Sequence, residues 1–394
     1  MGIERFFSSL TRDFNVVTDL KKPYQKINCT HFMIDFNSII HNVSSKMISS
    51  NDFKTIDSFE IELVENVKKN VIDMLENNLE SDKLNYIMIA IDGVPSFAKM
   101  MEQKKRRYIG DLFKTLMKDV ELPINWSKNN ISPGTKFMDQ LCKELNKKKF
   151  IDDCKKVCKN LEGVLVSDVY NPGEGEMKII NCLKELNKTD KRICVYSPDS
   201  DMILLLILLD IPTILLRYDQ QKSKIEKKEI YNLINVNNFK NQLVKYCSER
   251  VDFKIDKSLI VKEIVYIFTL FGDDFLPKLE SIDVASDINY LIDNYLVTVK
   301  DRGNLLNKKN KEYDLNVEAI KSLFERLSKF EISDLNRNFY NSKFRNYKYA
   351  TQNNLNMDFK ILLKHIDEIK KDFNKSQNIN EFFDFFTKNN SYKK

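Results

Sequence analysis

The sequence has few histidines, no closely paired cysteines and no apolar stretch long enough to cross a bilayer. With only three histidines, the seven cysteines lack the partners that a mixed His/Cys zinc site needs. Their odd number and the absence of a CxxC pair argue against a disulfide framework and favour a reducing compartment. The longest apolar stretch, residues 202–216, is interrupted by Asp210 and Pro212. It therefore predicts a buried helix followed by a buried strand rather than a membrane span.

The N-terminal segment MGIERFFSSL lacks the apolar region of a signal peptide, and Phe6 stands where a myristoylation motif needs Ser or Thr. The 63 basic residues exceed the 57 acidic residues by a formal charge of +6. This modest excess is compatible with an anionic partner and does not require one. We therefore expect a soluble, intracellular protein.

Short apolar segments alternate with helical patterns over the first 280 residues or so. Segments that are apolar almost throughout are typical of strands covered on both faces of a sheet; they lie at 31–36, 86–92, 163–168, 192–197 and 212–217. Helical patterns lie between them, at 58–79, 98–118, 136–160 and 174–187. This order predicts an α/β fold with a mostly parallel, twisted sheet flanked by helices.

The pattern changes after residue 279. Residues 300–316 are rich in Lys and Asn and predict an exposed loop, and residues 317–394 predict helices with aromatic and basic side chains. We expect an α/β core over residues 1–285 and a C-terminal helical extension over residues 286–394.

Acidic residues follow the predicted strands or begin the predicted helices at five places, where ligands bind in open parallel sheets. Each acid alone could be a helix cap or a turn residue. Together they would repel one another unless cations neutralised them, and oxygen-only shells suit Mg²⁺ or Mn²⁺. Two such ions about 4 Å apart form the usual clamp for phosphodiester hydrolysis. The seven acids are Asp35, Asp92, Glu174, Glu176, Asp199, Asp201 and Asp274, the last preceded by Asp273.

A basic segment, residues 98–108, follows Asp92 closely. On a helix, Lys99, Gln103, Arg106 and Arg107 share one face, whereas Lys104 and Lys105 point elsewhere. Such a run is usually only a solvated helix face. Beside a metal centre, however, the same face could hold a substrate phosphate, because arginine binds phosphate with two hydrogen bonds. The sequence therefore favours a metal-dependent nuclease.

Six blocks carry a resemblance to the Xrn/Rat-type 5′→3′ exoribonucleases, from residue 1 to about residue 344. They are IDFNSIIH (34–41), IDGVPSFAKMMEQKKRRY (91–108), ISPGTKFM (131–138), NPGEGEMKI (171–179), SPDSDMILL (197–205) and LFGDDFLPKL (270–279). FYNSKF (339–344) resembles the start of the second conserved region of that family. Single blocks such as DGVP also suit the related flap endonucleases, so the resemblance implies a PIN/flap-nuclease-like core.

The resemblance implies that the seven acids ligate two Mg²⁺ ions, with Mn²⁺ as the alternative metal. It also implies that Lys99, Gln103, Arg106 and Arg107 bind a 5′-monophosphate. His41 would stack on the first base, although a satisfied polar residue at a helix start is the alternative. The implied substrate is single-stranded RNA with a 5′-monophosphate, degraded to 5′-mononucleotides.

The partners that this resemblance implies are decapping or other RNA-decay proteins. We further expect a monomer without a membrane partner. Cytoplasm is favoured over nucleus, because the only dense basic cluster, residues 104–107, overlaps the phosphate pocket.

Two departures from the family pattern concern the substrate. DGVPSFAK carries Pro95 one place earlier than the usual DGVAPRAK. The given sequence also ends soon after FYNSKF, so we expect no counterpart of the tryptophan that stacks opposite the histidine in the family, and we expect Trp126 to be packed. The candidate replacements as a stacking face are Tyr340, Tyr347 and Tyr349.

Two alternative functions stay open at this point. A flap or other structure-specific DNA nuclease on the same scaffold would cut forked DNA at least as fast as single-stranded RNA. A non-catalytic RNA-binding module would bind RNA without metal-dependent turnover.

Overall fold

The structure, a computed structural model, describes residues 3, 6–14, 17–19, 26–48, 53, 55–116, 126–186, 191–209, 211–226, 229–309, 312–338 and 341. Its contacts divide the chain into two compact units. Unit 1 comprises residues 1–2, 10–101 and 121–243, and unit 2 comprises residues 3–9, 102–120 and 244–394. The predicted division at residue 285 stays a prediction.

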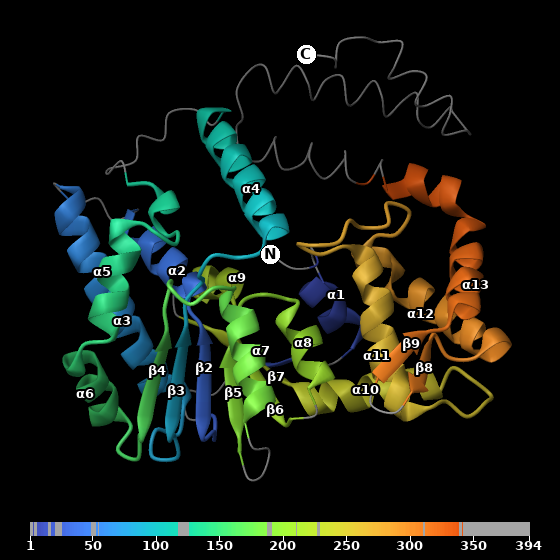
Figure 1. The fold of residues 1–394 in the computed structure, drawn as a ribbon, viewed down its shortest axis with the longest axis horizontal. Helices are drawn as coiled ribbons and strands as arrows, with labels where there is room; N and C mark the ends of the chain where they lie inside the picture. Colours follow the sequence, from blue (N-terminus) through green and yellow to red (C-terminus); the bar gives the residue numbers. More distant parts are fainter. Residues whose placement is uncertain are drawn as a thin grey trace. The chain divides into compact units, whose positions relative to one another are not determined.

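Unit 1 is built on a seven-stranded sheet of order β1-β7-β6-β5-β2-β3-β4 (Figure 1). Five consecutive strands, β6, β5, β2, β3 and the edge strand β4, run parallel, and β7 runs antiparallel to both of its neighbours. The bounds are β1 Val17–Asp19, β2 His31–Asp35, β3 Tyr86–Ala90, β4 Gly163–Ser167, β5 Ile193–Tyr196, β6 Thr213–Tyr218 and β7 Tyr231–Asn235. The five predicted strands and the α/β fold class are thus confirmed.

Helices cover both faces of this sheet. On one face, α2 (Asn37–Ile48), α3 (Ile56–Asn78), α5 (Lys136–Leu145) and α6 (Lys148–Val157) form one apolar core with the inward side chains of the strands. On the other face, α7 (Gly175–Glu185) packs on β2 and β3, followed by α8 (Met202–Leu208). The predicted helical pattern at 136–160 is two helices, because α5 ends at its C-cap Asn146 and α6 starts again from Lys147.

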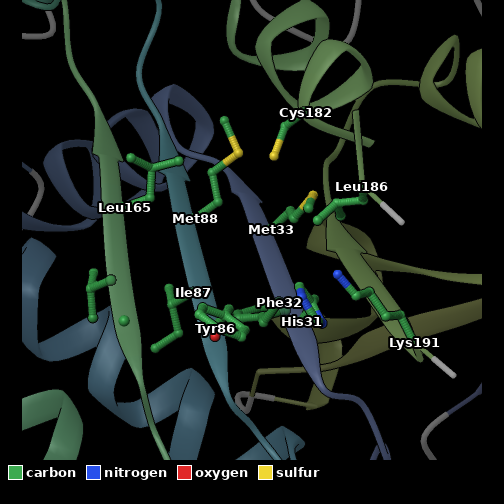
Figure 2. A pocket seen from close by; sticks show the side chains of 12 residues that line it. His31, Phe32, Met33, Tyr86, Ile87, Met88, Leu165, Cys182, Leu186 and Lys191 are labelled. Atoms are coloured by element: carbon green, nitrogen blue, oxygen red, sulfur yellow. The ribbon is translucent and has the colours of Figure 1, made fainter. Parts of the chain in front are cut away.

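The face that carries α7 also holds an apolar pocket of about 370 Å³ near the amino ends of the strands (Figure 2). Strand starts such as His31, Tyr86 and Gly163 line it, and Cys182 of α7 and the C-cap residue Leu186 form a wall. Among the described residues that line it, none is Asp or Glu. This pocket is therefore separate from the carboxyl ends of the strands, where the predicted acids lie.

The remaining elements of unit 1 are η1 (Lys128–Asn130) and α9 (Gln220–Glu226). Three of the described helices cross the boundary between the units, α1 (Phe6–Asp13), α4 (Phe97–Leu116) and α10 (Val236–Ser248). Helix α4 confirms the predicted helical pattern at 98–118. No helix in the described ranges is both long and apolar enough to cross a membrane.

Unit 2 contains α11 (Lys257–Phe268), η2 (Thr269–Phe271), α12 (Val284–Arg302), α13 (Val317–Ser328) and a hairpin of β8 (Leu306–Lys309) and β9 (Glu312–Leu315). Helix α1 (Phe6–Asp13) contributes Phe6, which packs edge-on against Phe268. The fully buried Glu263 accepts hydrogen bonds from the Tyr295 hydroxyl at 2.5 Å and from the Leu306 N–H at 2.8 Å. These contacts fix the start of the hairpin, so the prediction of a plain loop over residues 300–316 is wrong.

Candidate active site

Six of the seven predicted acids lie in unit 1, at the carboxyl ends of its parallel strands. Asp35 is the last residue of β2, and Asp92 follows β3 by two residues. The other four belong to the segments that follow β4 and β5. Glu174 is the N-cap of α7, Glu176 lies in its first turn, and Asp201 is the N-cap of α8, with Asp199 just before it.

Two of these carboxylates are held by hydrogen bonds from neighbouring segments. Asp35 Oδ2 accepts from the Ser197 hydroxyl at 2.8 Å, and Ser197 Oγ in turn accepts from the Asp199 N–H at 3.1 Å. Asp92 Oδ1 accepts from the Gly175 N–H at 2.7 Å. The helix start of α7 thus orients Asp92 as well as carrying its own glutamates, and Ser197 is a site residue that sequence reasoning missed.

Gly175 is a glycine because the acids leave no room for a side chain. A Cβ atom there would lie 2.8 Å from the Ala90 carbonyl oxygen, 2.9 Å from Asp35 Oδ1 and 3.4 Å from Asp92 Oδ1. The carboxylates of two different strands therefore flank the same point at the start of α7. This close approach gives a physical reason for the glycine between Glu174 and Glu176.

Lys99, at the start of α4, is directed into the acids rather than into solvent. Its side chain is 5% exposed, and its Nζ lies 2.6 Å from Glu174 Oε1. Its charge also lowers the pKa values of Asp92 and Glu176, but this effect is smaller than that of burial. One residue of the predicted phosphate face thus stands beside a predicted metal ligand.

Burial and the neighbouring carboxylates raise the pKa values of three of these acids, Asp35, Asp92 and Glu176. The pKa of Asp35 lies well above its usual range because of burial first and of Asp92, Asp199 and Glu176 next. Burial, then Asp199 and Glu174, raise the pKa of Glu176 to about 8. The pKa of Asp92 is raised by burial, although its hydrogen bond from Gly175 opposes the shift. The site therefore carries more negative charge than its own residues neutralise.

This donor set suits divalent cations. In the part of the chain that the structure describes, no three Asp, Glu, His or Cys side chains stand close enough to hold a metal ion by themselves. However, six carboxylates from four segments repel one another at one sheet edge, and all of their donor atoms are oxygen. Such a set favours Mg²⁺ or Mn²⁺, which would remove the repulsion.

The stability of the metal-free protein is expected to fall as pH rises from about 5 to about 8.5. Glu176 has a pKa of about 8 in place of 4.5, so across this window the folded protein keeps a proton that the unfolded chain has lost. Each rise in pH within this window therefore favours the unfolded chain, which has released the proton, over the folded protein, which still holds it. Thermal unfolding in EDTA should show Tm falling by several degrees, since roughly 2–4 °C corresponds to 1 kcal/mol in a domain of this size. Glu176→Gln should flatten the slope, and a wild-type Tm that is constant or rises over this window would contradict the assignment.

Lys178 joins the two strand ends that carry the site. Its Nζ donates to the carbonyl oxygens of Ile91 at 2.6 Å and of Asp168 at 2.8 Å, beyond β3 and β4. The Gly93 and Gly173 backbones add a hydrogen bond of 2.9 Å between the same loops. Lys178 stands within the NPGEGEMKI block, yet nothing in the sequence alone indicates this role. It is a positioning residue for Asp92 and the α7 helix start.

Replacing Lys178 by methionine should raise the Mg²⁺ concentration needed for half-maximal activity by roughly 10–100-fold, as for other residues that orient metal ligands. Lys178→Arg should restore part of the loss. Lys184→Met, on an exposed position of the same helix, is the matched control. A similar Mg²⁺ requirement in Lys178→Met and Lys184→Met would rule out the positioning role.

Four other predicted site residues, Asp274, Gln103, Arg106 and Arg107, belong to unit 2. Asp274 follows η2 in a turn where Asp273 Oδ1 accepts from the Phe275 N–H at 2.8 Å and the Leu276 N–H at 2.7 Å. Gln103, Arg106 and Arg107 lie on the unit 2 part of α4, where Arg106 Nη2 is 3.7 Å from Glu102 Oε2. The roles of Asp274 and of these three residues stay predictions.

The aromatic candidates differ in what the structure describes. His41 is exposed on α2, and its stacking role stays a prediction. Trp126 is buried between Phe59 and Phe137, and its Nε1 donates to Glu60 Oε1 at 2.8 Å. The expected packing of Trp126 is thus confirmed. Tyr340, Tyr347, Tyr349 and most of FYNSKF lie outside the described residues.

Comparisons with known proteins place the chain among relatives. The chain is 36% identical over 213 residues to R528 of Acanthamoeba polyphaga mimivirus, a 5′-3′ exonuclease by name, covering 52% of this chain and 34% of R528. It is 26% identical to 5′-3′ exoribonuclease 1 of Saccharomyces cerevisiae over 387 residues, covering 88% of this chain and 24% of that protein. The chain thus spans about a quarter to a third of these relatives.

Among solved structures, the catalytic core of Rad2 in complex with DNA substrate aligns with a TM-score of 0.39 and 12% identity, over 92% of this chain and 84% of that one. The XRN 5′-3′ exonuclease N-terminus family matches residues 1–219, which is more than half of the chain and includes all six acids of unit 1. The chain therefore belongs to the XRN 5′-3′ exonuclease N-terminal family.

Proposed function

We propose that this protein degrades single-stranded RNA with a 5′-monophosphate from its 5′ end, releasing 5′-mononucleotides by two-metal hydrolysis. The observation that supports the proposal most is the contact between Lys99 and the carboxylates. A cation of the phosphate face lies 2.6 Å from Glu174, a carboxylate of the predicted metal site. A terminal phosphate bound by Lys99 would leave the first phosphodiester beside the carboxylates, which is catalysis by positioning.

Three groups of residues would have separate roles: binding the metal ions, orienting the metal ligands and binding the terminal phosphate. Asp35, Asp92, Glu174, Glu176, Asp199 and Asp201 would hold two Mg²⁺ or Mn²⁺ ions, together with Asp274. Ser197 and the Gly175 N–H would keep Asp35 and Asp92 oriented. When bound, the ions would supply an activated water and charge stabilisation for the attacked phosphate and its leaving oxygen. Gln103, Arg106 and Arg107 would complete the phosphate pocket with Lys99.

The test compares 3′-labelled single-stranded RNA that ends in 5′-monophosphate, 5′-hydroxyl or 5′-triphosphate, with Mg²⁺ and with EDTA. The proposal predicts Mg²⁺-dependent loss of the monophosphate substrate alone, with mononucleotide products. Equal loss of all three substrates would support a nuclease and would contradict the assignment of the phosphate pocket. Faster cutting of forked DNA would favour a flap nuclease, and binding without turnover would favour a non-catalytic module.

A further inference from the structure

A stripe of polar residues runs along α2 away from the acids. Asn37, His41 and Ser45 are four residues apart, so they lie on one face of the helix. Asn37 Oδ1 accepts a hydrogen bond from the Asp92 N–H at 3.1 Å, which fixes the first end of the stripe beside the carboxylates. His41 and Ser45, one and two turns further on, are both exposed. A ligand that begins at the acids can therefore continue along this face.

A lysine from a distant segment meets the far end of the stripe. Lys128 belongs to η1, and its Nζ donates to Ser45 Oγ at 2.6 Å, while the Ser45 hydroxyl donates to the His41 carbonyl oxygen at 2.6 Å. Two residues earlier, the buried Trp126 anchors this turn to Glu60 of α3. The position of Lys128 is thus set by a packed anchor and not by a free loop.

The length of the stripe fits a few nucleotides. Eight residues of helix separate Asn37 from Ser45, which is about 12 Å at a rise of 1.5 Å per residue. A stacked strand advances about 3.4 Å per nucleotide, so this distance corresponds to roughly three or four nucleotides. We infer that Lys128 and Ser45 form a downstream subsite for a backbone phosphate of a single strand whose 5′ end lies at the acids. This inference rests on the proposed function, because the proposed function places the 5′ end there.

The test measures binding, so it does not depend on turnover. Fluorescence anisotropy measures the affinity for a 5′-phosphorylated hexanucleotide that is labelled at its 3′ end, in EDTA and in Ca²⁺. The affinity for an unlabelled dinucleotide is measured by its competition with this hexanucleotide. Lys128→Gln should weaken hexanucleotide binding roughly three- to fivefold at low salt and lower the salt slope by about 0.7, the value for one phosphate contact. Dinucleotide binding should not change. Lys46→Gln is the control. Lys46 is next to Ser45 on α2, and its Nζ lies 2.7 Å from Glu229 Oε1, so this variant should bind the hexanucleotide almost as tightly as wild type.

A chemical substitution locates the contact. A neutral methylphosphonate linkage is moved along the first four positions of the hexanucleotide. A methylphosphonate at the third or fourth nucleotide should weaken binding to the wild-type protein by the same factor as the Lys128→Gln substitution does. The same methylphosphonate should not weaken binding to the Lys128→Gln variant any further. Equal hexanucleotide affinities of wild type and Lys128→Gln, or an equal loss on the dinucleotide, would overturn the subsite. Wild-type binding without cleavage in Mg²⁺ would instead overturn the proposed function, and the two failures are thereby distinguished.

Discussion

Replacing Asp92 by asparagine is expected to lower Mg²⁺-dependent cleavage roughly a thousandfold or more, because a predicted ligand of the metal centre is removed. The asparagine oxygen can still accept the hydrogen bond from the Gly175 N–H, so the start of α7 should stay in place. The fold should not weaken. Because the charged form of Asp92 is disfavoured by burial and by its acidic neighbours, Tm in EDTA should stay constant or rise.

Loss of activity together with an unchanged or higher Tm separates catalysis from folding. The control is Asp139→Asn, which removes a carboxylate of α5 that is bound by Lys143 at 2.7 Å and by the Tyr170 hydroxyl at 2.6 Å. This control should keep full cleavage. Wild-type activity in Asp92→Asn would remove Asp92 from the metal site. Asp274→Ala tests the seventh predicted ligand in the same assay, and Asp273→Ala serves as its neighbouring control for the turn.

The second large effect concerns the choice of 5′ end. Replacing both Arg106 and Arg107 by glutamine should remove the preference for 5′-monophosphate over 5′-hydroxyl RNA, which we expect to be at least about a hundredfold, since charge-assisted bonds to phosphate contribute roughly 1.5–3 kcal/mol each. The measurement is kcat/KM on both substrates. Activity on the 5′-hydroxyl substrate should change little, because that substrate lacks the group that the arginines bind.

The helix provides its own matched control for this experiment. Lys104→Gln with Lys105→Gln removes the same number of charges from the same turn of α4, but from other faces of the helix. This pair should keep the preference for the 5′-monophosphate. A preference that survives the arginine exchange would show that Arg106 and Arg107 do not bind the 5′-phosphate. An equal loss in the lysine pair would show that net charge, and not a phosphate pocket, governs the choice.

The parallel strands could be predicted from the sequence because they are almost continuously apolar. Burial accounts for this pattern in β2, β3 and β5, whereas the edge strand β4 is apolar although it is partly exposed. Strand β7, with the sequence YNLIN, lacks that signal and was not predicted. The hairpin of β8 and β9 was predicted as a loop, because its side chains are mostly exposed and polar and show no alternation. Its start is fixed by the buried Glu263, whose partners are 32 and 43 residues away.

The candidate site shows the same limit. The acids could be predicted because their positions relative to strand ends are local properties of the chain. The roles of Ser197, Asn37 and Lys178 could not, since each depends on a partner from another segment, 55 to 162 residues away. Lys99 was predicted to bind phosphate on a shared helix face. Its burial against Glu174 is a tertiary contact that no helix pattern contains.

The most direct test of the central claim is the binding of Mn²⁺ to the full chain, measured by isothermal titration at pH 7.5. It compares wild type with the variant that carries Asp35→Asn and Asp92→Asn. We predict two Mn²⁺ ions per wild-type chain, a rise in Tm on binding, and loss of both the heat and the Tm shift in the variant. Wild-type protein without Mn²⁺ binding, or a variant that binds two ions with wild-type affinity, would contradict the account of these carboxylates as a metal centre.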